Sequence, residues 1–309
     1  MFESSPCIPI LVHFHNAPDV KAGGIIDQSG TSITAFNTSS TLSNYDTVYI
    51  PADITTITSQ IFRNKFMGTG NCGTIQNIIF ADRTVNCDTG LDAFSVGQYD
   101  SLYLPGDIYI GKGVYKCNGN DYGGFFSGGN IHLGNVTING TCTSNTKFFS
   151  SNDEMIIGNV DIDKDCTVIG PTIKFFSNSG YQTHPMHTII GNITIKGECK
   201  INCNFDYSTF FASFAGSSEC VVSIGNILIN GACSNINSYS GAHFFSAYGP
   251  NAVMETGNIT INNDCIDTGV ASGSLFFSCF SSGSGNSSLI TQNIAINANC
   301  TCADQGADR

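Results

Sequence analysis

Apolar and polar positions alternate in a short unit that recurs along the chain. Three copies are closely similar: Ile-Gly-Asn-Val-Asp-Ile-Asp-Lys-Asp-Cys at 157–166, Ile-Gly-Asn-Ile-Thr-Ile-Lys-Gly-Glu-Cys at 190–199 and Ile-Gly-Asn-Ile-Leu-Ile-Asn-Gly-Ala-Cys at 224–233. Looser copies occupy 133–142, 256–265 and 291–300. Self-similarity at this spacing is typical of a solenoid, whose units bury their apolar faces only by stacking on one another.

The alternation predicts one short strand in each unit. Apolar residues two positions apart lie on the same side of a strand, so the Ile-x-Ile core faces inward and each unit adds one strand to a parallel sheet. We therefore expect a β-rich solenoid of about nine units over 45–300, with an N-terminal cap or arm at 1–44 and a C-terminal tail at 301–309. The first inward residues of the strands are expected at Val48, Ile78, Leu102, Val136, Val160, Ile193, Ile227, Ile259 and Ile294.

The first units resemble a known repeat family. The segment from Val48 through Ile50-Pro51 to Ile61-Phe62, and the segment from Leu102 to Ile108, are similar to bacterial-surface-antigen (BspA-like) leucine-rich repeats. This resemblance implies a leucine-rich-repeat-like stack with a single parallel sheet, and a role in adhesion or recognition at a surface. Most units are longer than the 20–29 residues usual for leucine-rich repeats, and the Pro disappears after the third unit. A right-handed parallel β-helix therefore remains the alternative fold.

Six of the fourteen cysteines share one repeat position, where earlier units place Ile54 and Ile108. A position that accepts Ile or Cys is typical of a buried apolar site, so we expect a column of reduced thiols. Disulfides between neighbouring rungs are the alternative, because strands about 4.8 Å apart bring the Cα atoms within bonding range. The six residues are Cys142, Cys166, Cys199, Cys233, Cys265 and Cys300.

A Phe-Phe pair follows most units. We expect one Phe of each pair to stack on its counterparts in adjacent rungs, forming a spine that closes the convex side of the core. The pairs are Phe148/Phe149, Phe175/Phe176, Phe210/Phe211, Phe244/Phe245 and Phe276/Phe277.

Composition restricts the partners. The formal net charge of −12 and pI of about 4.6 argue against nucleic acid and anionic membranes as partners. No apolar run is long enough to span a bilayer, so we expect no membrane insertion. The first residues show no basic region of a signal peptide. The surface role implied by the resemblance nevertheless predicts an extracellular or cell-surface location.

Catalytic and metal-binding patterns are sparse. Asp161, Asp163 and Asp165 share one side of their strand and form a weak calcium candidate, although Cys166 stands where a calcium loop has Gly. A solvated acidic patch is the other interpretation. The pairs His13/His15 and His184/His187 lack partners at metal-site spacing. No nucleophile elbow or phosphate loop occurs, so we predict no enzyme activity and no cofactor.

The outward positions of the predicted sheet form a grid of Asn and Thr. They could bind a protein or glycan ligand, or the Asn side chains could simply hydrogen-bond from rung to rung. The main prediction is a non-enzymatic adhesion or recognition module. The alternatives are a structural subunit that self-associates through its solenoid ends, and a carbohydrate-active β-helix with two facing carboxylates. The predicted binding residues are Asn135, Thr137, Asn139, Asn192, Thr194, Asn226, Asn230, Asn258, Thr260 and Asn262.

Overall fold

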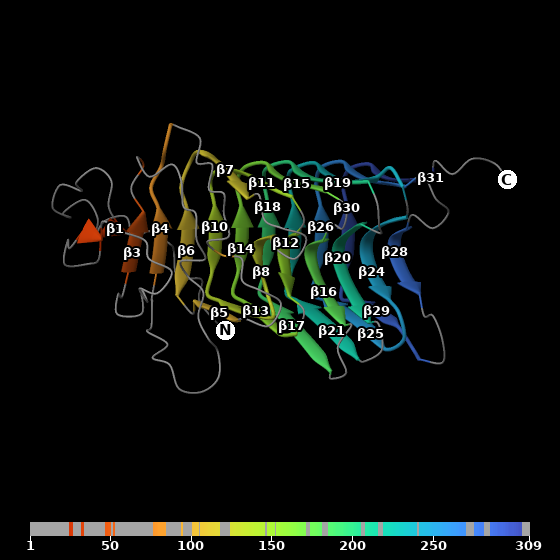
Figure 1. Ribbon diagram of the computed structural model, residues 1–309. Coiled ribbons are helices and arrows are strands. Elements are labelled where there is room, and N and C mark those ends of the chain that lie inside the picture. The colour runs from red at the N-terminus through yellow and green to blue at the C-terminus, as the bar shows by residue number, and fades with distance from the viewer. Residues whose placement is uncertain are drawn as a thin grey trace.

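A computed structural model gives the arrangement of the strands. It describes residues 25–26, 32–33, 47–50, 52, 77–84, 94, 101–104, 106–117, 124–145, 147–151, 153–170, 174–180, 185–204, 208–215, 219–239, 241–269, 275–280 and 285–304. Within these ranges the chain is a parallel β-solenoid, and no helix occurs among the described residues. The strands of its longest sheet stack side by side, with β1 near one end and β30 at the other (Figure 1).

The described strands form four sheets, and from β5 onward the chain visits them in the order B, A, C, D in each rung. Sheet A is 11-stranded: β1 (Ile25–Ile26), β2 (Ser32–Ile33), β3 (Thr47–Ile50), β4 (Asn77–Phe80), β6 (Asp107–Ile110), β10 (Val136–Ile138), β14 (Val160–Ile162), β18 (Ile193–Ile195), β22 (Ile227–Ile229), β26 (Ile259–Ile261) and β30 (Ile294–Ile296). Sheet B is 7-stranded: β5 (Ser101–Leu104), β9 (Asn130–Leu133), β13 (Met155–Ile157), β17 (Met186–Ile190), β21 (Cys220–Ile224), β25 (Ala252–Thr256) and β29 (Ser288–Thr291).

The other two sheets follow sheet A along the chain. Sheet C is 7-stranded: β7 (Val114–Cys117), β11 (Thr141–Ser144), β15 (Cys166–Gly170), β19 (Cys199–Cys203), β23 (Cys233–Asn237), β27 (Cys265–Gly269) and β31 (Cys300–Asp304). Sheet D is 6-stranded: β8 (Gly124–Gly128), β12 (Lys147–Ser151), β16 (Lys174–Gly180), β20 (Ser208–Ala215), β24 (Ala242–Tyr248) and β28 (Leu275–Phe280).

The β-rich solenoid predicted from the sequence is confirmed, but the single sheet is wrong. Four sheets surround the core, which is the architecture of the parallel β-helix alternative. The error has a physical reason. The segments between the Ile-x-Ile strands are rich in Ser, Gly and Asn, which usually indicates turns, yet they also place residues inward and pair in register with the next rung.

The predicted strand positions hold for sheet A with one exception. Leu102 lies in β5 of sheet B, where it pairs with Ile131. The sheet A strand of that unit is β6, and its Ile108 pairs with Val136. Ile108 is therefore not at the cysteine position, which Tyr115 occupies opposite Cys142. Ile54 lies outside the described residues.

The cysteine position forms the predicted column. Cys142, Cys166, Cys199, Cys233, Cys265 and Cys300 pair in register from β11 to β31, and all six are free thiols. The first five are buried, and Cys300 in the last rung is partly exposed. Burial, assisted by the neighbouring thiols, raises the pKa of Cys166 and Cys233 well above the usual value.

The Phe pairs form two columns rather than the predicted single spine. In one column, ring centroids of successive rungs lie 4.7–5.1 Å apart from Phe125 to Phe276. In the other they lie 4.8–5.2 Å apart from Phe126 to Phe277. The pairing of β12 with β16 passes from Lys147↔Lys174 directly to Phe149↔Phe176. The first Phe of each pair therefore has no backbone pairing partner in the neighbouring strand. This local irregularity allows both Phe rings to face the core.

The predicted domain boundaries stay a prediction, and described strands lie at both of them. The region assigned to an N-terminal cap contains β1 and β2, which extend sheet A by antiparallel pairing: Ile26 pairs with Tyr49 of β3, and β2 pairs with β1. Strand β31 continues to Asp304, past the boundary predicted at residue 300.

Candidate binding surface

The outer face of sheet A is the candidate site. We use the term ladder face for the outward residues of β6, β10, β14, β18, β22, β26 and β30 together with the residues at the two ends of these strands. Its middle row is in register from rung to rung, with partly exposed side chains up to β26 and an exposed Ala295 at the end. The middle row is Tyr109, Thr137, Asp161, Thr194, Leu228, Thr260 and Ala295.

An asparagine ladder borders this row where sheet B turns into sheet A. From Asn135 to Asn226, the side-chain Oδ1 accepts the backbone N–H of the Asn in the next rung, at 2.8–2.9 Å. In the last step, Asn258 Oδ1 accepts from Asn293 Nδ2 at 2.7 Å. Later members also donate from Nδ2 to the preceding Oδ1, as Asn226 does to Asn192 at 3.1 Å. Asp107 takes the equivalent place in the first of these rungs and accepts from Asn135 Nδ2 at 2.9 Å. The ladder comprises Asn135, Asn159, Asn192, Asn226, Asn258 and Asn293.

The Gly before four of the ladder Asn residues is required by close approach. A Cβ added to Gly191 would lie 2.8 Å from Asn159 Oδ1 and 2.9 Å from the backbone carbon of Gly158. The same contact with the preceding Asn recurs at Gly158, Gly225 and Gly257. The repeated Gly-Asn dipeptide is therefore the sequence signature of a corner where the backbone packs directly on the rung before it.

A second polar row lies at the opposite edge of the face, where sheet A turns into sheet C. Asn262 Nδ2 donates to Asn230 Oδ1 at 2.9 Å, and Asn297 Nδ2 donates to Asn262 Oδ1 at 2.7 Å. In the middle rungs an ion pair replaces the amides, with Lys196 Nζ 2.6 Å from Asp163 Oδ1. This hydrogen bond, with the charges of Asp163 and Asp161, raises the pKa of Lys196.

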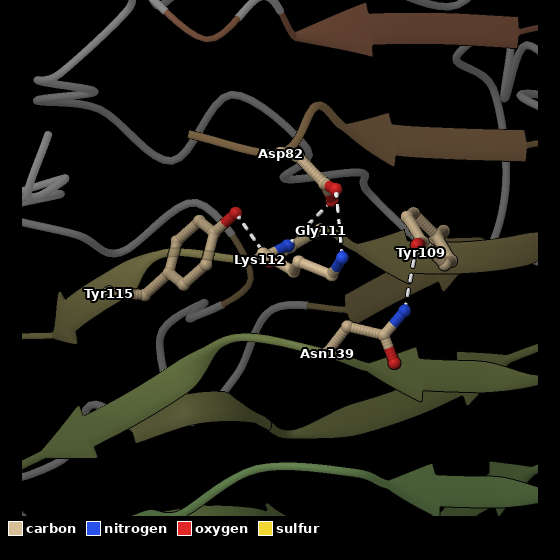
Figure 2. A network of polar contacts seen from close by, with 6 residues as sticks. All are labelled: Asp82, Tyr109, Gly111, Lys112, Tyr115 and Asn139. Carbon is tan, nitrogen blue, oxygen red and sulfur yellow. Dashed lines mark hydrogen bonds and ion pairs between the residues drawn. The ribbon is translucent and has the colours of Figure 1, made fainter. Parts of the chain in front are cut away.

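The first described rungs add groups that the sequence analysis did not identify. Asn139 Nδ2 donates to the Tyr109 hydroxyl at 2.7 Å, and the backbone N–H of Lys112 donates to Asp82 Oδ1 at 2.8 Å (Figure 2). On the other side of the Gly111 turn, the Tyr115 hydroxyl donates to the Gly111 carbonyl at 2.9 Å. The sequence pattern does not single out Tyr109, because it predicts the strand of that unit at Leu102. The sequence feature that indicates Tyr109 is Asp107. This hydrogen-bond acceptor comes directly before an Ile-x-Ile core, in the place that Asn takes in later units.

The weak calcium candidate does not form a site. Asp163 pairs with Lys196, and Asp165 Oδ1 accepts the backbone N–H of Glu198 at 2.9 Å. Asp161 lies in the middle row. Across the described ranges, no three His, Cys, Asp or Glu side chains are grouped in a way that could hold a metal ion.

The histidines are only partly described. His13, His15 and His184 lie outside the described residues, and His187 is exposed on sheet B. His132, also on sheet B, has its Nε2 2.7 Å from Glu154 Oε2 and its ring 5.8 Å from that of Tyr103.

The ten predicted binding residues all lie on the ladder face, but they differ in what their side chains do. The Asn residues make the rung-to-rung hydrogen bonds described above, so their amides are largely committed to the scaffold. The three threonines, Thr137, Thr194 and Thr260, stand in the middle row and are partly exposed. A ligand on this face would therefore contact the middle row, between two borders held in place by hydrogen bonds.

Comparisons with known proteins do not assign a family. No protein-family model matches the chain, and no curated protein or solved structure is significantly similar to it. The resemblance to BspA-like repeats therefore stays a prediction. A search of the described residues for a helix sufficiently long and apolar to cross a membrane finds none.

Proposed function

We propose that this chain is a non-enzymatic recognition module that binds a glycan on the ladder face. The observation that supports this proposal is the middle row of partly exposed side chains, repeated in register along sheet A between two hydrogen-bonded borders. Because these borders fix the surface before a ligand arrives, little conformational entropy would be lost on binding.

The chemistry of the face favours a glycan over a protein. Protein interfaces usually centre on buried aromatic or Arg anchors, whereas most of the middle row consists of short side chains, three of them Thr. The threonine hydroxyl groups of the middle row suit a hydroxyl-rich ligand, and Tyr109 at one end offers a ring for a sugar. Each polar contact contributes only about 0.5–1.5 kcal/mol, so useful affinity requires contacts on several rungs or several copies of the chain.

The test is a glycan array probed with the purified chain, followed by a triple variant. Changing Thr137→Glu, Thr194→Glu and Thr260→Glu together should abolish binding to any glycan found, while the circular dichroism spectrum stays unchanged. The matched control places the same three charges on the outer face of sheet C, at Thr143, Thr167 and Thr301, which are all outward-facing.

Binding that survives the first triple variant would place recognition elsewhere. Binding only to a protein would contradict the glycan assignment. Hydrolysis of a polysaccharide that depends on one carboxylate would overturn the non-enzymatic function.

A further inference from the structure

The C-terminal rung leaves core positions open to solvent. Ile294 and Ile296 of β30 are 44% and 45% exposed, whereas Ile259 and Ile261, in the same register one rung earlier, are 1% and 0% exposed. Phe276 and Phe277, at the end of the two aromatic columns, are also only partly buried. The described part of the chain thus ends in an apolar cross-section of its own core.

The backbone edge of β30 is open as well. In the rung before, the N–H of Ile259 donates to the carbonyl of Asn293 at 2.8 Å. Ile294 occupies the equivalent position in β30, and within the described residues no strand follows β30 in sheet A. Unpaired edge groups of this kind are a template for pairing with another chain.

The same rung lacks the features that usually protect a sheet edge. Charged side chains and Pro are the common means of blocking edge pairing, yet residues 268–303 contain no Asp, Glu, Lys, Arg, His or Pro. Elsewhere the chain is strongly acidic, with a net charge of −12. Two copies would repel each other through most of their surfaces. The strands β28 to β31 can meet with little repulsion, because Asp304 at the end of β31 is the one charged residue among them.

The opposite end of sheet A is built differently. There β1 covers the edge of β3 by antiparallel pairing, and β2 in turn covers β1. Among the described strands of this sheet the outermost, β2, has only 2 residues. Very short edge strands are poor templates for further pairing, and this end also shows that sheet A accepts an antiparallel neighbour.

We propose that the C-terminal rung binds a second copy of this chain, with β30 pairing antiparallel to β30 of the partner subunit around a two-fold axis. The partner's rung presents the same uncharged apolar surface, so Ile294 and Ile296 become buried in both subunits. Because the same surface is used on both sides, assembly closes at two copies instead of continuing as a filament.

The test is sedimentation velocity of the full chain, with reducing agent present because Cys279 and Cys302 are exposed. The wild-type chain should show a concentration-dependent equilibrium between monomer and dimer. The double variant Ile294→Lys/Ile296→Lys should weaken the dimer by about 100-fold or more, because two unpaired charges per subunit would enter the interface. Circular dichroism should show that the double variant keeps its sheet content, since both side chains are already nearly half exposed.

The matched control adds the same charge to the same rung but on its outer side. Ala295→Lys/Thr301→Lys changes two exposed, outward-facing residues of β30 and β31 and should alter dimerisation by no more than about 3-fold. A wild-type chain that stays monomeric at about 100 μM, far above the micromolar range of weak specific complexes, would overturn the proposal. Open-ended oligomers, or equal loss of dimer in both variants, would also overturn it.

Discussion

Sheet D and sheet A form two sides of the solenoid. Both sides are built from the same rungs, but different interactions join one rung to the next on each side. On the sheet D side, two columns of buried Phe rings stack from rung to rung. Buried polar side chains also bond to backbone there, as Ser213 does to the Cys220 carbonyl at 2.6 Å. On the sheet A side the inward residues from β6 to β30 are aliphatic. The rung-to-rung contacts on its outer face are amide hydrogen bonds open to water.

This difference indicates where the stability of the molecule resides. Buried aromatic surface contributes roughly in proportion to its area, whereas an exposed hydrogen bond replaces one with water and contributes little net free energy. The sheet D side should therefore dominate the free energy of unfolding, and the sheet A side should mainly hold the rungs in register and keep its outer face flat.

The largest expected effect is on the aromatic columns. Phe211 is fully buried, with ring centroids 5.2 Å from Phe176 and 4.9 Å from Phe245. Phe211→Ala should lower the free energy of unfolding by about 3–5 kcal/mol, through lost burial and the cavity left behind. Denaturant titration would measure the loss, and Phe211→Leu should recover more than half of it. A loss below about 1 kcal/mol would show that the columns are not the main stabilising element.

The second effect is a pH dependence on the same side. Burial lowers the pKa of His243 to about 4, whereas an unfolded His has a pKa of about 6.5. Between these two values the unfolded chain binds the extra proton, so stability falls as pH drops from about 6.5 to about 4. Denaturant titration at pH 7 and pH 4.5 should show a loss of about 2–3 kcal/mol from this residue. His243→Gln should remove that part of the loss, and an unchanged slope would assign it to other groups.

The third effect concerns the asparagine ladder. Asn192 Oδ1 accepts two hydrogen bonds from Asn226, from the backbone N–H at 2.8 Å and from Nδ2 at 3.1 Å. Asn192→Ala should lower the free energy of unfolding by about 1–2 kcal/mol. Asn192→Asp keeps the acceptor and should lose less, as Asp107 does this work in an earlier rung. If Asn192→Ala lowers the free energy of unfolding as much as Phe211→Ala does, then the sheet A side contributes as much to stability as the sheet D side.

The smallest effect is expected in the thiol column of sheet C. Cys233 is buried between Cys199 and Cys265 and is free. Cys233→Ala should lower the free energy of unfolding by only about 1 kcal/mol, because only one sulfur atom is lost from the core. Mass spectrometry of the unreduced protein should find the column uncross-linked. Disulfides among its members, with a large loss of stability on reduction, would contradict this prediction.

The Ile-x-Ile strands and the cysteine column could be predicted from the sequence because their spacing is constant. Each unit carries the same inward residues, and Ile or Cys at one position indicates burial without further context. The strand position of Leu102 was wrong because the Leu-x-Leu-Pro segment fits the repeat pattern at least as well as Asp107–Ile110 does. Only the pairing of Ile108 with Val136 decides between the two segments.

Sheet D and the ladder face show what the sequence could not supply. The strands of sheet D contain Ser, Gly and Lys, which in a sequence usually indicate turns. Which of their side chains face the core depends on a strand pairing that leaves out the first Phe of each pair. For the ladder face, the sequence predicted which residues point outward. It could not separate amides that serve the scaffold from threonines that remain available, because that distinction lies in hydrogen bonds between rungs.

The direction of the backbone hydrogen bonds has a mechanical consequence. They run between rungs, from Ile193 to Asn226 and from Ile227 to Asn258 for example, and so lie along the solenoid axis. A force that pulls the two ends apart loads one inter-rung layer after another, and the layer at an end fails first because it has only one neighbour. A force across the axis meets many bonds at once. The molecule should therefore act as a body that is stiff to sideways shear but peels from its ends.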